Sequence, residues 1–187
     1  MPDLVDSDAV IPSEDILVRL LQMGVVIEEY AEEKSARILG MSADDELTSE
    51  ILADSKDESK EHRDKLVSLI EGVSDSDVDK REVERLVRDA VERTVSEPAG
   101  SDEALRQQLK SERLAYEFYD SLIEACRKSE GYIDMSPEEL ERVVSQIEEI
   151  RDDEREDAEK LESMLQANGN GAMDVDIDTE KETQGVN

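Results

Sequence analysis

Apolar residues recur at alternating steps of three and four along most of this chain, which is the spacing of the buried face of an amphipathic helix. No segment carries a convincing strand pattern. The spacing and its cap signals predict five helices. They cover residues 14–39 after the cap Ser13, 45–72, 78–95, 101–129, and 137–167 after the cap Ser136. We therefore expect an all-α protein.

Two of the links between these helices are short, so the helices they join are expected to form antiparallel hairpins. Residues 41–44 form the first link and residues 130–135 the second. The connection between the hairpins contains the shorter helix 78–95 and is long enough for a crossover. The expected fold is an antiparallel four-helix bundle over residues 13–167, with this shorter helix between its second and third helices. Residues 168–187 are glycine-rich and acidic and are expected to be a disordered tail.

The inward face of each long helix is apolar at its ends and polar near its middle. The inward positions are Leu17, Leu21, Gly24, Glu28, Ala31, Ser35 and Ile38 on the first helix; Leu52, Ser55, Ser59, His62, Leu66, Leu69 and Val73 on the second; Leu105, Leu109, Glu112, Tyr116, Tyr119, Ile123 and Cys126 on the fourth; and Leu140, Val143, Ile147, Ile150, Glu154, Asp157, Leu161 and Met164 on the fifth. The ionisable residues among them are Glu28, His62, Glu112, Glu154 and Asp157.

Carboxylates on the inward face of a helix cost several kcal/mol each unless they are neutralised or paired. Four of them at one level of a bundle also repel one another, so protons, a cation or water must compensate. Gly24 and Ala31 flank Glu28 on the same face and leave room for such a cluster.

The charge of the chain is strongly acidic, with 22 basic and 52 acidic residues and a net charge of −30. Such a field repels phosphate backbones and argues against nucleic acid as a partner. The acidic residues are spread through every segment, which is typical of a halophile's cytosolic protein hydrated at high salt. The alternative is an acidic interaction protein that recruits basic partners.

Cysteine usage and the N-terminal residues bear on the cellular compartment. Cys126 is the only cysteine, which excludes an internal disulfide and paired-cysteine metal sites, and it is expected to be a small buried apolar residue. The first residues lack the basic and apolar regions of a secretion signal. The longest apolar run, about Val25 to Ile27, is too short to span a membrane. We expect a cytoplasmic protein without membrane contact.

The polar positions resemble the ferritin-like superfamily, especially rubrerythrin-type bundles, over about residues 14–167. In that family two helices each give a Glu and two give a Glu-x-x-His pair, all pointing inward to hold two irons. Glu28 matches the first-helix glutamate, and Glu112-Arg113-Leu114-Ala115 followed by Tyr119 resembles the third-helix segment. Lys60-Glu61-His62-Arg63 is similar to the end of the second-helix motif. Residues 153–161, with Glu154, resemble the closing motif.

Two positions depart from the family pattern, so the resemblance is to an altered di-iron site. Ser59 stands where the family has a glutamate, and Asp157 replaces the second histidine. The remaining four carboxylates and one imidazole suit one iron or manganese ion better than a balanced pair. Glu58 is a weaker substitute for Ser59, because one residue rotates it about 100° from the inward face.

Two functions stay open from the sequence. The resemblance implies a metal protein that handles iron or reduces peroxide or oxygen, with Glu28, His62, Glu112, Glu154 and Asp157 as ligands. An electron-donor protein is then expected as a partner, and a homo-oligomer is left open. The alternative is a metal-free ferritin-like scaffold whose vestigial site holds protons or water. Aromatic residues at this spacing favour core packing, with hydrogen bonding to a cluster carboxylate as the second interpretation.

Overall fold

The computed structural model describes residues 5, 8–41, 46–73, 83–85, 87 and 100–167, and these residues form helices and no strand. The long helices are α1 (Glu14–Met41), α2 (Glu46–Val73), α4 (Ser101–Lys128) and α5 (Pro137–Ala167). Each boundary lies within two residues of the sequence prediction. The all-helical class is confirmed for this part of the chain.

The cap signals explain why two of the helices begin where they do. The Ile16 amide donates to Ser13 Oγ at 3.4 Å. At α5 the Glu139 amide donates to Ser136 Oγ at 3.2 Å, and the Ser136 amide donates to Glu139 Oε2 at 3.0 Å. This reciprocal pair is a capping box, as the sequence predicted.

The predicted shorter helix and tail fall largely outside the described residues. Of the segment 78–95, residues 83–85 and 87 are described, and all four are helical. Val83 and Val87 are buried in the main apolar core. Residues 168–187 lie outside the described ranges, so the tail stays a prediction.

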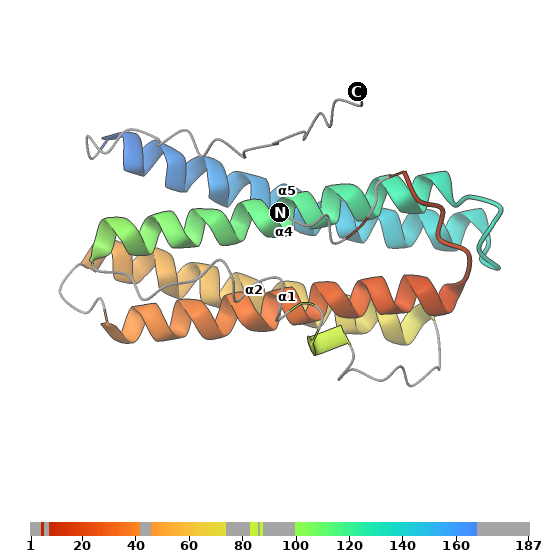
Figure 1. The fold of residues 1–187 in the computed structure, drawn as a ribbon, viewed down its shortest axis with the longest axis horizontal. Helices are drawn as coiled ribbons and strands as arrows, with labels where there is room; N and C mark the ends of the chain where they lie inside the picture. The colour runs from red at the N-terminus through yellow and green to blue at the C-terminus, as the bar shows by residue number, and fades with distance from the viewer. Residues whose placement is uncertain are drawn as a thin grey trace, which may run out of the picture.

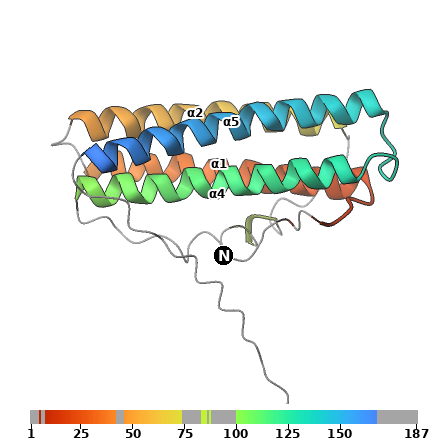
Figure 2. The ribbon, with the colours of Figure 1, turned by 90° about the horizontal axis from the view of Figure 1, so that it is seen from above.

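The four long helices lie side by side along their lengths (Figures 1 and 2). The colour order in Figure 1 shows that the chain runs one way along α1 and back along α2, then one way along α4 and back along α5. The contacts within these two pairs far exceed those between them. The molecule is thus built from two helical hairpins, with α1 facing α4 and α2 facing α5 (Figure 2).

The predicted inward faces are the buried faces. Every predicted inward position is buried except five half-buried ones, which are Val73, Leu109, Tyr116, Asp157 and Met164. The largest apolar cluster draws on all four long helices, and it includes Leu21, Leu66 and Ile147. Two smaller clusters, around Leu52 and around Leu161, lie toward the other end of the bundle. The polar residues of the inward faces lie between these apolar regions.

Candidate metal centre

Each long helix brings one buried carboxyl or imidazole side chain to the polar level of the core. These are Glu28 from α1, His62 from α2, Glu112 from α4 and Glu154 from α5, and they are 1%, 3%, 6% and 4% exposed. Their places follow from the steps of three and four that keep an inward face toward the partner helices. Ionisable groups this deeply buried require charge or hydrogen-bond compensation.

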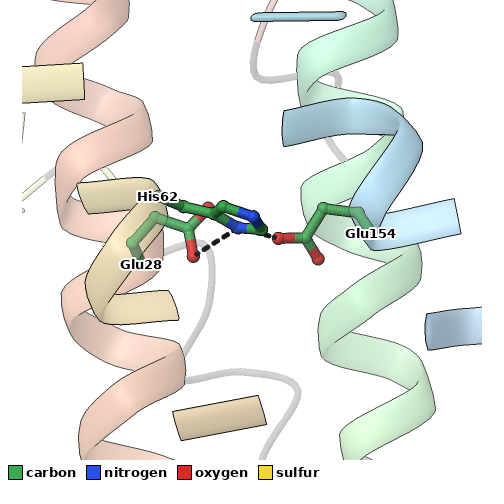
Figure 3. A group of neighbouring side chains, drawn as sticks. All are labelled: Glu28, His62 and Glu154. Atoms are coloured by element: carbon green, nitrogen blue, oxygen red, sulfur yellow. Dashed lines mark hydrogen bonds and ion pairs between the residues drawn. The ribbon is translucent and has the colours of Figure 1, made fainter. Parts of the chain in front are cut away.

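Glu28, His62 and Glu154 converge on one point between the hairpins (Figure 3). One ligand atom from each lies within 4.8 Å of those of the other two. His62 Nδ1 is 3.0 Å from Glu154 Oε1 and 4.0 Å from Glu28 Oε2. The three side chains thus present two oxygens and one nitrogen to the same small volume.

The other ring nitrogen of His62 is oriented by a carboxylate near the surface. His62 Nε2 is 3.2 Å from Asp153 Oδ2, and the Asp153 side chain is 52% exposed. Burial is the main influence on His62 and lowers its pKa, whereas Asp153 acts to raise it. A neutral ring that donates Nε2–H to Asp153 leaves the Nδ1 lone pair facing Glu28 and Glu154. A carboxylate behind a histidine is the usual way of orienting a metal-binding imidazole.

Glu28 is held by hydrogen bonds from two neighbouring side chains. The Tyr119 hydroxyl donates to Glu28 Oε1 at 2.5 Å, and the Ser59 side chain also hydrogen-bonds the Glu28 carboxyl. Tyr119 also packs edge-on against Phe118, with ring centroids 5.2 Å apart. It therefore both packs in the core and hydrogen-bonds a cluster carboxylate, the two interpretations considered from the sequence. Glu28 Oε2 is the oxygen that faces His62.

Glu154 carries a buried oxygen with no donor. Glu154 Oε1 contacts His62, but Oε2 has no hydrogen-bond partner. The Glu112 and Glu154 carboxyls interact closely enough to shift each other's pKa through a side-chain hydrogen bond, which requires a proton on one of them. Gln108 Nε2 donates to Glu112 Oε1 at 2.5 Å and fixes that carboxyl. A shared proton or a cation is therefore needed beside Glu154 Oε2.

Burial raises the pKa of the three buried carboxyls Glu28, Glu112 and Glu154. It raises the pKa of Glu28 to about 8, against hydrogen bonds from Tyr119 and Ser59 that act to lower it. The pKa values of Glu112 and Glu154 are also raised, chiefly by burial, and that of Glu154 further by the charges of Glu28 and Glu112. These shifts favour the protonated form of the three carboxyls unless a cation displaces the protons.

The residues present fit a single metal cation. Carboxylate oxygens and one imidazole nitrogen form a donor set suited to iron or manganese. The Nδ1 atom of His62 already faces one oxygen of Glu28 and one of Glu154, and the second Glu154 oxygen has no hydrogen-bond partner. Glu112 lies beside Glu154 and can supply a further oxygen.

Asp157 lies apart from the triad of Glu28, His62 and Glu154. Its side chain is half-buried, and Lys160 Nζ donates to its Oδ1 at 2.8 Å. Burial acts to raise the pKa of Asp157, but hydrogen bonds with Glu58 and Lys160 hold it below its usual value. Among the residues predicted as ligands, the structure brings together Glu28, His62 and Glu154, sets Glu112 beside them, and leaves Asp157 at the edge. Its role as a ligand stays a prediction.

Several contributors to the site were not singled out from the sequence. Asp153 precedes the inward Glu154 by one residue and orients His62 by a hydrogen bond. Gln108 precedes the inward Glu112 by four residues and orients it by a hydrogen bond. Lys34, one residue before the inward Ser35, is buried beside α4. Glu58, by contrast, was considered from the sequence as a weaker substitute for Ser59; it is half-buried against Asp157, and burial raises its pKa to about 8. For Asp153 and Lys34, the signal in the sequence was adjacency to an inward polar position, Glu154 and Ser35 respectively.

Comparison of the chain with protein-family models, with curated proteins and with solved structures gives no match. Among the described helices, none is both long enough and apolar enough to span a membrane.

Proposed function

We propose that this chain is a ferritin-like metal protein in which Glu28, His62 and Glu154 hold one iron or manganese ion. The proposal includes an antiparallel ferritin-like arrangement of the four long helices. The observation that carries it is the convergence of Glu28, His62 and Glu154 in the core, where one ligand atom from each lies within 4.8 Å of the other two and Glu154 Oε2 has no hydrogen-bond partner. Glu112 is the nearest further carboxylate, and its contact with Glu154 supports a role as a fourth ligand.

The residues around the triad act by orienting its ligands. Tyr119 and Ser59 hold Glu28 so that Oε2 points to the site, and Asp153 holds the His62 ring. Leu66, one turn beyond His62, is fully buried and keeps that side of the site apolar. A bound iron or manganese ion supplies one-electron redox chemistry, so we propose iron handling or reduction of peroxide or oxygen as the activity. Electrons come in this proposal from a partner protein.

The test is the metal content of the native protein by elemental analysis, before and after reconstitution with Fe²⁺ or Mn²⁺. We expect close to one ion per chain in the wild type, and loss of the ion in His62→Ala, Glu112→Ala and Glu154→Gln. Glu149→Gln is the matched control, because Glu149 is an exposed glutamate of the same helix as Glu154. A wild type that stays without metal after reconstitution contradicts the proposal.

The alternative function is a metal-free scaffold, and one observation favours it. The carboxyl-to-carboxyl contact between Glu112 and Glu154 can be satisfied by a shared proton alone. A metal site predicts a melting temperature that rises with added Mn²⁺ according to its affinity. A scaffold predicts no response to Mn²⁺ and stabilisation on acidification alone.

A further inference from the structure

Lys34 places a positive charge inside the bundle beside the candidate metal centre. It lies on α1 and is 4% exposed. Its Nζ donates to the Gln107 carbonyl oxygen at 2.5 Å and to Ser111 Oγ at 2.6 Å, both on α4. Lysine is almost never this deeply buried, and a buried ammonium group needs compensating charge.

Both hydrogen-bond acceptors of Lys34 are neutral, and the carboxylate whose charge acts on it is Glu112. Burial lowers the pKa of Lys34 to about 8, while the Glu112 charge acts to raise it. In return, the charge of Lys34 acts to lower the pKa of Glu112. Polar links join the same two helices next to this pair, since Ser35 Oγ donates to Gln108 Oε1 at 3.0 Å and Gln108 donates to Glu112. Lys34 is thus electrostatically part of the buried carboxylate group.

We propose that Lys34 is the resident positive charge of the metal centre and sets its preference for a single divalent ion. The inference rests on the metal-binding function proposed above. The three carboxylates Glu28, Glu112 and Glu154 carry three negative charges when a metal has displaced their protons. One divalent ion together with the Lys34 ammonium balances them. A trivalent ion, or a second divalent ion, leaves an excess of positive charge in the core, where charge is poorly screened.

This charge also affects redox chemistry at the site. A fixed positive charge in a low-dielectric core disfavours the more highly charged oxidation state of a nearby metal. Lys34 therefore favours the ferrous over the ferric ion and the divalent over the trivalent state of manganese. In this role Lys34 determines specificity without being a ligand.

The test compares Lys34→Met with Lys128→Met, which removes the same charge from an exposed position at the far end of α4. Metal-free proteins are titrated separately with Mn²⁺ and with Tb³⁺, a trivalent probe. Lys34→Met removes the repulsion between the Lys34 ammonium and the bound cation. We expect it to tighten Mn²⁺ binding by about tenfold and Tb³⁺ binding by more, so that the ratio of trivalent to divalent affinity rises. Lys128→Met is expected to change either affinity by less than about twofold, because solvent and salt screen an exposed charge.

The outcomes separate this inference from the proposed function. If the wild type binds neither ion, the metal-binding function itself fails. If the wild type binds Mn²⁺ but Lys34→Met leaves both affinities unchanged or weakens both alike, Lys34 is only structural and the inference is overturned. If Lys34→Met does not fold, Lys34→Gln serves as the second neutral variant. The wild-type stoichiometry gives an independent check, because two Mn²⁺ ions per chain at this cluster also overturn the inference.

Discussion

The metal-free protein should become more stable as the pH falls from about 7.5 to about 5.5, and Glu28 should carry much of this effect. Burial raises the pKa of Glu28 to about 8 in the folded chain, against a value of 4.5 without burial. Between these two values the folded state holds a proton that the unfolded state has released. Folding stability is therefore present at the acidic end of this window and is lost as the pH rises through it.

The magnitude follows from the width of the window. Each pH unit inside it changes the free energy of unfolding by about 1.4 kcal/mol for one fully linked proton, which gives about 3 kcal/mol between pH 5.5 and pH 7.5. Glu28→Gln removes this titration while keeping the size of the side chain and an oxygen that accepts from Tyr119. The difference in pH dependence between wild type and variant isolates the share of Glu28 from that of the surface carboxylates.

The assay is urea unfolding at fixed salt with a chelator present, followed by far-UV circular dichroism at several pH values across the window. Glu33→Gln, an exposed position on the same helix, is the control and should keep the wild-type dependence. In Glu28→Gln, the change in the free energy of unfolding between pH 5.5 and pH 7.5 should be smaller than in the wild type by about 3 kcal/mol. If Glu28→Gln instead keeps the full wild-type dependence, Glu28 is ionised in the folded core and the argument from burial is wrong.

Two further substitutions test how Glu28 is held. Tyr119→Phe removes the hydroxyl that donates to Glu28 and should lower the free energy of unfolding by about 1–3 kcal/mol in the same urea assay, whereas Tyr116→Phe at a half-buried position should cost less. Gly24→Ala places a Cβ 3.2 Å from Leu66 Cδ1 and 3.3 Å from Tyr119 Cε1 and should destabilise the bundle by about 1 kcal/mol or more, while Gly40→Ala, with open space around its Cβ, should be neutral or stabilising. Equal melting temperatures for the two alanine variants would show that the Leu66 and Tyr119 side chains move freely aside.

The helices could be predicted closely from the sequence because their signals are local. The capping box at Ser136 and the cap at Ser13 depend on residues within one turn, and both form as expected. The inward faces were predictable for a similar reason, since a four-helix core must be filled from repeating positions. The exceptions are informative: Tyr116 and Asp157 sit at inward positions but are half-buried. Their exposure depends on how the hairpins meet, which no local pattern encodes.

The site was predictable in its centre and not in its surroundings. Glu28, His62 and Glu154 lie on inward faces, so their convergence needed only that the helices align at one level. Asp153 and Lys34 lie next to inward positions and reach the site sideways. The Asp153 contact depends on the rotation of α5, and the Lys34 contacts depend on side-chain conformation, because a long side chain can reach inward from the flank of a helix.

The triad joins the two hairpins at the level where the apolar core is interrupted. Glu28 and His62 belong to one hairpin and Glu154 to the other, so whatever neutralises the triad also holds the hairpins together. Protons and a metal cation compete for the same oxygens, and this gives acid two opposite effects. A falling pH stabilises the metal-free bundle by supplying protons, but it weakens metal binding because those protons must be displaced. A protein that uses the triad for metal should therefore lose its metal-induced stabilisation in the same pH range in which its metal-free form gains stability, whereas a scaffold held by protons shows only the gain.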